Sequence, residues 1–285
     1  MKLSEKFTKG KCVFSLEIFP PKKDMSPDTV YKTIDSLKNL RPAFISVTYG
    51  AGGTSGDNIT GEVAAYIKGQ GVDSAAHLTC VSNTRADIDI LLEDFKAKGI
   101  ENILALRGDI NPERPPKHDF EHACDLVRYI KEKGDFHISG ACYPECHTEA
   151  KSFEADIARL KEKVDAGVTH LMSQLFFDNE AFYRFLDMVH GAGIYVPIEA
   201  GIMPVTNKKS IERMVSITGA SLPAKFTRIM ARYENNPEAL RDAGIAYAAD
   251  QIVDLISSGV DGIHLYTMNN PYVAEKIYAA VEGLL

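Results

Sequence analysis

The sequence alternates short apolar runs with stretches of helical periodicity, and this alternation limits the possible folds more than any other feature. Eight runs are rich in β-branched and aromatic residues. Most of them are apolar almost throughout, as expected for parallel strands that are covered by helices. The predicted strands are Cys12–Phe19, Phe44–Tyr49, Asp73–Thr79, Ile103–Arg107, His137–Tyr143, His170–Phe177, Val196–Ile202 and Gly262–Thr267.

Amphipathic stretches lie between these runs. Ser26 and Pro27 provide an N-cap residue and an N1 proline for the first of them. Five later glycines stand where helices are expected to stop: Gly99, Gly134, Gly167, Gly193 and Gly259. The predicted helices are Val30–Leu40, Thr84–Lys98, Phe120–Lys133, Ser152–Ala166, Glu180–Ala192 and Asp242–Ser257.

Eight strand-and-helix repeats favour one (β/α)8 barrel, an α/β TIM-barrel fold, over an open doubly wound sheet. The chain of 285 residues has a suitable length for one such barrel and contains no linker, so we expect a single domain over residues 1–285. The longer interval between the seventh and eighth strands is predicted to hold extra helices at Lys208–Thr218 and Pro223–Tyr233.

Composition narrows the class of protein. The net charge is -7 with acidic and basic residues interleaved, which argues against a nucleic-acid partner. There is neither a signal-peptide pattern nor an apolar run of about 18 residues that could span a membrane. Five cysteines in a chain large enough to fold without disulfides indicate reduced thiols, so we expect a cytoplasmic protein.

The active site of a barrel lies at the carboxyl ends of its strands, and polar residues gather there in this sequence. Each has an ordinary explanation on its own: a buried structural carboxylate, a hydrogen-bonded histidine, a local ion pair or a glycine turn. Their occurrence together at strand ends indicates a site. The residues are Glu17, Thr48, Gly50–Gly53, His77, Arg107, Asp109, Tyr143, His147, Gln174 and Tyr266.

Six short motifs around these positions carry a family resemblance. They are Glu-Ile-Phe-Pro-Pro, Ser-Val-Thr-Tyr-Gly, Ala-His-Leu-Thr-Cys, Leu-Arg-Gly-Asp, Tyr-Pro-Glu-Cys-His and Tyr-Thr-Met-Asn. In this order, the set resembles the bacterial methylenetetrahydrofolate reductases over most of the chain. The resemblance implies a barrel that holds FAD and reduces 5,10-methylenetetrahydrofolate to 5-methyltetrahydrofolate. Hydride would pass in a ping-pong cycle from a reductant to the flavin and then to the folate.

Glu17 matches the catalytic glutamate of that family, which implies a general acid that protonates the folate. The residues beside Glu17 in the sequence are apolar, namely Phe14, Leu16, Ile18 and Phe19. We expect them to give the carboxyl group a low-dielectric environment, which favours its neutral form.

Asp109 matches the family aspartate close to the flavin and the folate, where negative charge would stabilise a developing iminium cation. Gln174 matches a folate contact, and Tyr266 is expected in the same cleft. Asp156 and Lys163 lie seven residues apart on one helix face, which without the resemblance indicates only a solvated surface. The implied FAD contacts are Thr48, His77, Arg107, Asp109, Tyr143, His147, Asp156 and Lys163.

Two departures from the family pattern leave the electron donor open. Lys208 follows Asn207 where enteric enzymes have a phenylalanine that stacks on folate or nicotinamide, and Asn270 stands where a basic residue is usual. NADH is therefore one candidate donor. A partner protein that delivers electrons is the other, in which case the chain is a dependent flavin-binding subunit. We expect a homo-oligomer or a complex with such a partner.

Two other interpretations stay open at this point. The spacing of Cys142 and Cys146, with His147 and Cys80 on the same barrel face, permits a zinc or iron site, although the spacing is not that of a closed zinc site and we expect no metal. The barrel could also belong to an aldolase or a folate-binding methyltransferase without flavin.

Overall fold

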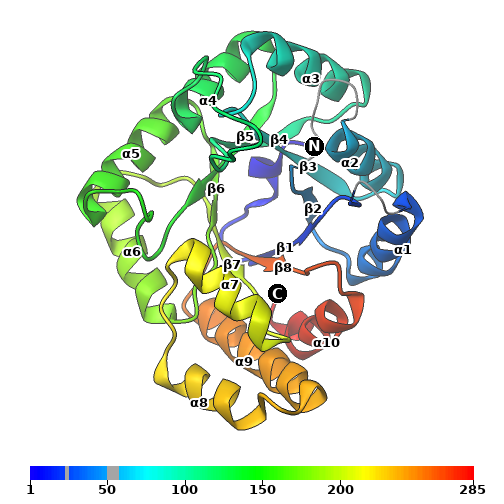
Figure 1. The fold of residues 1–285 in the computed structure, drawn as a ribbon, viewed down its shortest axis with the longest axis vertical. Helices are drawn as coiled ribbons and strands as arrows, with labels where there is room; N and C mark the ends of the chain where they lie inside the picture. Colours follow the sequence, from blue (N-terminus) through cyan, green and yellow to red (C-terminus); the bar gives the residue numbers. More distant parts are fainter. Residues whose placement is uncertain (23–25, 50–57) are drawn as a thin grey trace.

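The computed structural model describes residues 1–22, 26–49 and 58–285. Eight parallel strands form a closed barrel in which each strand pairs with the next in the chain and β8 pairs with β1 (Figure 1). The predicted TIM-barrel fold is confirmed. The strands are β1 Val13–Ile18, β2 Phe44–Val47, β3 Asp73–Thr79, β4 Asn102–Leu106, β5 His137–Cys142, β6 His170–Ser173, β7 Ile198–Ile202 and β8 Gly262–Tyr266.

Helices surround the barrel, and two of them, α7 and α8, confirm the extra helices predicted between the last two strands (Figure 1). Two others, α2 and α10, lie outside the helix spans predicted from the sequence. The helices are α1 Pro27–Leu37, α2 Ile59–Gly69, α3 Arg85–Ala97, α4 Ala123–Lys133, α5 Phe153–Asp165, α6 Asn179–Gly191, α7 Lys208–Thr218, α8 Ala224–Tyr233, α9 Pro237–Ser257 and α10 Pro271–Val281.

Local signals explain most of the boundaries. Ser26 caps α1 by accepting a hydrogen bond from the backbone amide of Asp28, and Pro27 is the first helical residue, as predicted. All five predicted glycine stops lie just beyond helix ends. Four of them adopt the left-handed conformation that favours glycine: Gly99, Gly167, Gly193 and Gly259.

Several predicted boundaries differ from the structure by up to three residues, and two are wrong by more than that. Strand β6 ends at Ser173 rather than Phe177, because the backbone amide of Leu175 donates to the side chain of Gln174 and the chain leaves the sheet. Helix α9 begins at Pro237 rather than Asp242, since Asn236 caps it and proline suits its first position. The apolar run His170–Phe177 therefore contains both a strand and the loop that follows it.

The barrel separates two environments. Side chains that point outward from the strands, such as Leu16 and Ile18, form an apolar core with the surrounding helices. The inner face carries buried polar side chains together with a smaller apolar cluster that includes Phe44 and Leu104. At the amino ends of the strands, a short 3-10 helix (Leu3–Lys6) closes the barrel, and the ring of Phe7 lies 4.7 Å from that of His170.

No helix in the described part of the chain is long and apolar enough to cross a membrane.

Close packing of α9 against the loop after β7 predicts a sensitive position. A Cβ atom added to Gly244 would overlap the carbonyl oxygen of Val205 and lie 2.8 Å from its carbonyl carbon. We expect Gly244→Ala to lower the free energy of unfolding by about 1–3 kcal/mol, because the backbone must move apart. Gly191→Ala is the control, since nothing lies within 4 Å of its added Cβ. Urea denaturation that gives equal stabilities for the two variants would contradict this packing.

Candidate active site

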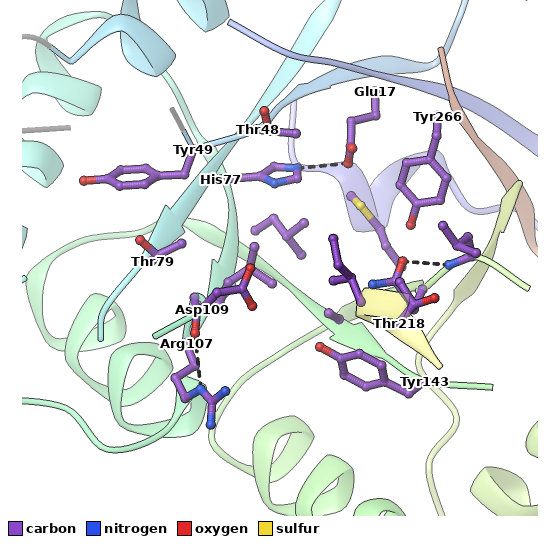
Figure 2. A pocket seen from close by; sticks show the side chains of 18 of the residues that line it. Glu17, Thr48, Tyr49, His77, Thr79, Arg107, Asp109, Tyr143, Thr218 and Tyr266 are labelled. Atoms are coloured by element: carbon purple, nitrogen blue, oxygen red, sulfur yellow. Dashed lines mark hydrogen bonds and ion pairs between the residues drawn. The ribbon is translucent and has the colours of Figure 1, made fainter. Parts of the chain in front are cut away.

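A cavity of about 610 Å³ opens at the carboxyl ends of the strands, a volume within the usual range of small-molecule sites. Figure 2 shows its labelled side chains converging from opposite sides of the barrel. Helix α7 contributes part of one wall through Met214, Ile217 and Thr218. The predicted site residues that line the cavity are Glu17, Thr48, His77, Arg107, Asp109, Tyr143, His147, Gln174 and Tyr266.

Glu17 faces two histidines at the base of the cavity. Its Oε2 atom lies 3.4 Å from Nε2 of His77 and 3.5 Å from Nε2 of His264, and only 12% of the side chain is exposed. Figure 2 shows Glu17 and His77 pointing toward each other. Burial lowers the pKa of His77 to about 4, so its imidazole is neutral at physiological pH.

The expected apolar surroundings of Glu17 are largely wrong. Phe14, Leu16 and Ile18 belong to the outer core beneath the helices, whereas Glu17 points into the barrel. Successive side chains of a strand point to opposite faces, so the immediate sequence neighbours of Glu17 are not its spatial neighbours. Phe19, two residues further on, does line the cavity.

Residues after β8 fasten the end of β1 and so position Glu17. The hydroxyl of Thr267 donates to the carbonyl of Glu17 at 2.6 Å. The side-chain amide of Asn269 accepts from the backbone amide of Phe19 and donates to its carbonyl. Asn269 itself adopts a left-handed backbone, which asparagine tolerates better than most residues. In the Tyr-Thr-Met-Asn motif, Thr267 and Asn269 therefore fix the end of the strand that carries Glu17 by hydrogen bonds.

The Arg107-Gly108-Asp109 turn brings charge to the other end of the cavity. Gly108 has a left-handed φ of 86°, and a Cβ there would lie 2.9 Å from the Cβ of Thr79, so the turn requires glycine. Arg107 pairs through both terminal nitrogens with Glu149, at 2.5 and 2.9 Å. This guanidinium lowers the pKa of Glu149. The ion-pair partner of Arg107 is thus Glu149 rather than its near neighbour Asp109.

Two predicted cofactor contacts lie behind the cavity wall. Asp156 and Lys163, both on α5, line a separate cavity of about 30 Å³ with Tyr143. Asp156 accepts a hydrogen bond from the backbone amide of His147 at 2.9 Å, and Lys163 donates to the carbonyl of Ala141 at 2.7 Å. Both side chains therefore hold cavity-lining segments in place.

Tyr143 and His147 form an aromatic wall, with ring centroids 4.6 Å apart at an interplanar angle of 83°. Burial raises the pKa of Tyr143 to about 12, so its hydroxyl stays protonated. Gln174 lines the cavity just after β6. Tyr266 does so from β8, while its hydroxyl donates to the carbonyl of Ser173 at 2.7 Å. The ring of Tyr266, rather than its hydroxyl, is its free surface toward a ligand.

Sequence reasoning missed two parts of the site. His264 is two residues before Tyr266 on the same strand, so the period of two would have placed both on the inner face. The apolar side of the cavity includes several methionines, whose flexible side chains adapt to ligand shape, and no local pattern marks them. These residues are Met172, Met203, Met214 and Met268.

Of the two positions that depart from the family pattern, Asn270 has a structural role in the described residues, and so does Asn207 beside the other position. Asn207 caps α7 by accepting from the amide of Ser210, and Asn270 caps α10 by accepting from that of Val273. The side chain of Lys208 and the glycines at 50–53 lie outside the described residues. Among the described residues, no group of three or more His, Cys, Asp or Glu side chains could hold a metal ion.

Comparison with known proteins places this site in a family. The family model for methylenetetrahydrofolate reductase matches residues 2–282. The chain belongs to the methylenetetrahydrofolate reductase family. A 5,10-methylenetetrahydrofolate reductase from Pectobacterium carotovorum is 39% identical over 96% of this chain and 91% of its own. Methylenetetrahydrofolate reductase (NADH) 1 from Arabidopsis thaliana is 36% identical over 91% of this chain and 46% of its own.

Among solved structures, an uncharacterized protein from Clostridium thermocellum that binds two copies of 5-methyl-5,6,7,8-tetrahydrofolic acid aligns with a TM-score of 0.69. It covers 99% of this reductase-family chain and 96% of its own at 14% identity, so the likeness supports the fold alone.

The Arg107–Glu149 pair gives a prediction about anion binding. Because Glu149 competes for the guanidinium, we expect Glu149→Gln to strengthen binding of inorganic pyrophosphate by about threefold to fivefold. Isothermal titration calorimetry measures the affinity. Glu162→Gln, which breaks the exposed pair with Arg159 on α5, is the matched control and should leave it unchanged. Equal affinities in all three proteins would show that Glu149 does not compete with anions.

Proposed function

We propose that this protein reduces 5,10-methylenetetrahydrofolate to 5-methyltetrahydrofolate with FAD as its cofactor. The observation that carries the proposal is the position of Glu17 at the base of a cavity whose other end holds Arg107 and Asp109. A general acid and an anion-binding group then share one cavity. The family membership supplies the reaction to which this arrangement is suited.

The described residues fit a flavin dinucleotide. His77 lines the cavity, and its buried Nε2 atom makes no hydrogen bond despite its 3.4 Å distance from Oε2 of Glu17, so a polar ligand atom can satisfy it. Arg107 can exchange Glu149 for a diphosphate in the same two-pronged geometry. The proposed contacts that line the cavity are Thr48, His77, Arg107, Asp109, Tyr143 and His147, while Asp156 and Lys163 support the segments that carry them. When bound, FAD supplies the hydride that reaches the folate.

Side chains of the protein itself hold Glu17 in position, supply the proton and contact the folate. Thr267 and Asn269 fix the end of β1, so Glu17 is held where it can donate a proton to the folate nitrogen as the imidazolidine ring opens. Gln174 and the ring of Tyr266 border the same space and are proposed folate contacts. The carboxylate of Asp109 favours the cationic iminium that results.

NADH is the proposed electron donor, and the name of the Arabidopsis relative supports this choice. The alternative is a partner protein that delivers electrons to a dependent flavin subunit. Anaerobic mixing of the FAD-loaded protein with NADH distinguishes them, because direct donation bleaches the flavin spectrum without any second protein.

Glu17→Gln tests the general acid. The amide keeps the shape of the side chain but cannot donate the catalytic proton, so folate-dependent reoxidation of the flavin should slow by about 10²–10⁴-fold. Reduction of the flavin by the electron donor should stay within about twofold, since it needs no proton from Glu17. Stopped-flow absorbance measures both half-reactions. Normal folate turnover in the variant would remove Glu17 from the mechanism.

Asp109→Asn tests the electrostatic role. Removing the negative charge should raise the flavin midpoint potential by about 30 mV, equivalent to about 1.4 kcal/mol for two electrons. Glu113→Gln removes an equal charge from an exposed position in the same loop and is the control. Spectroscopic redox titration measures the potential. A potential that is the same in Asp109→Asn and in the wild type contradicts the role.

A further inference from the structure

A chain of buried polar side chains leads from Glu17 into the barrel. Glu17 Oε2 lies 3.5 Å from Nε2 of His264, whose Nδ1 lies 2.6 Å from the hydroxyl oxygen of Ser15. That oxygen lies 2.7 Å from Oε1 of Glu199. Ser15, Glu199 and His264 have no exposed surface. A second carboxyl group is thus connected to Glu17 without contact with solvent.

The barrel is shaped to hold Glu199. The facing residue on β8 is Gly262, and a Cβ atom there would lie 2.8 Å from Cγ of Glu199. A buried carboxylate costs several kcal/mol unless it is well compensated. Its Oε2 atom approaches Nε2 of His170 at 3.0 Å but forms no hydrogen bond there. The free-energy cost of burying the Glu199 carboxyl group indicates a role beyond packing.

The protons shared by Glu199, Ser15 and His264 can be arranged in two ways. The single hydroxyl proton of Ser15 can go to Glu199 or to His264, but not to both. When Glu199 is ionised, Ser15 donates to it, and His264 must carry its proton on Nδ1. When Glu199 is protonated, it donates to Ser15, Ser15 donates to Nδ1, and the histidine proton sits on Nε2, facing Glu17.

We propose that Glu199 stores the proton that Glu17 delivers to the substrate, and that Ser15 and His264 carry it between them. The inference rests on the proposed function, because it requires Glu17 to act as a general acid. Glu199 touches neither substrate nor cofactor and is a positioning residue for the proton.

The transfer conserves protons and charge. After Glu17 has given its proton to the folate nitrogen, Nε2 of His264 passes a proton to the Glu17 carboxylate. Nδ1 then takes the proton of Ser15, and Ser15 takes that of Glu199. Glu17 ends protonated and Glu199 ends ionised, with His264 in its other tautomer. No oxidant, reductant or additional group takes part.

The groups around Glu199 allow it to hold and release a proton. It faces His264 on β8 and His170 on β6, while Asp261 and Cys12 lie near enough to interact with it electrostatically. Burial lowers the pKa of His170 to about 3, so it supplies no positive charge. Desolvation raises the pKa of Glu199 to about 7. A carboxyl group with this pKa can both hold and release a proton at neutral pH.

One link is longer than a hydrogen bond, namely the 3.5 Å between Glu17 and His264. Glu17 points into open cavity, so rotation of its carboxyl group can shorten the distance. Catalytic hydrogen bonds often tighten only when the ligand is bound.

The first experiment measures single-turnover rates of folate-dependent flavin reoxidation between about pH 6 and pH 9. In Glu199→Gln, loss of the neighbouring carboxyl group should move the midpoint of the pH profile lower by about one unit. The rate near pH 8 should fall by about tenfold or more. Ser15→Ala, which interrupts the path but keeps both carboxyl groups, should also slow this step.

Ser139→Ala is the matched control. Its hydroxyl is equally buried and bonds Nδ1 of His170 at 2.9 Å, beyond Glu199 and outside the path. It should leave the rate and the pH profile unchanged within about twofold. Variants at Glu199 and Ser15 that behave like Ser139→Ala, or a pH-independent loss shared by all three, would overturn the proposal. If Glu199→Gln does not fold, the comparison of the two serine variants decides.

The second experiment needs no cofactor or substrate. Nitrogen-15 NMR of the histidine rings should show the proton of His264 moving from Nε2 to Nδ1 as the pH rises through about 7. Glu199→Gln should abolish this exchange, which a merely structural glutamate would not control. A constant His264 tautomer in the wild type overturns the relay. If the FAD-loaded wild type instead fails to reduce folate, the proposed function is wrong, and the NMR result still decides whether the relay exists.

Discussion

Closure of the sheet by the β1–β8 ladder is the constraint on which the site depends. Its register places Ser15 opposite His264 and Glu17 opposite Tyr266. Because side chains alternate along a strand, a slip of one residue would turn all four away from the barrel interior. The same ladder brings the carboxyl ends of the first and last strands together, where Thr267 and Asn269 fasten them. The position of Glu17 and the proposed proton path to it therefore share one structural origin.

The two faces of the sheet have opposite energetic roles. The outer face and the helices form a continuous apolar core, which supplies the hydrophobic stabilisation of the fold. The inner face buries serine, histidine and glutamate side chains, which cost free energy even when they are hydrogen-bonded. A polar barrel interior is thus supported by the layer around it. The chemistry of the site can vary on the inner face while the outer core keeps the fold.

Patterns local to one segment were the predictable part of this structure. Apolar runs located all eight strands, and the conformational preferences of glycine and proline located most helix ends. Relations between segments were not predictable in this way. Nothing near Arg107 in the sequence indicates that Glu149 is its partner. Likewise, Ser15 and Glu199 meet only because of the barrel register. The mistaken apolar surroundings of Glu17 have the same cause, since nearness in sequence was taken for nearness in space.

Closure of the barrel at the amino ends of its strands has a consequence for the timing of turnover. Leu3 and Phe7 cover the amino ends of the strands, and beneath them His170 and Ser139 are fully buried. Water therefore has no route to Glu199 from below through these residues. In the proposed relay, a proton that leaves Glu199 is therefore replaced from the cavity side of the described barrel, after product has left and before the next ligand arrives. Under this proposal, reprotonation of Glu199 and the exchange of ligands take place in the same interval of the catalytic cycle.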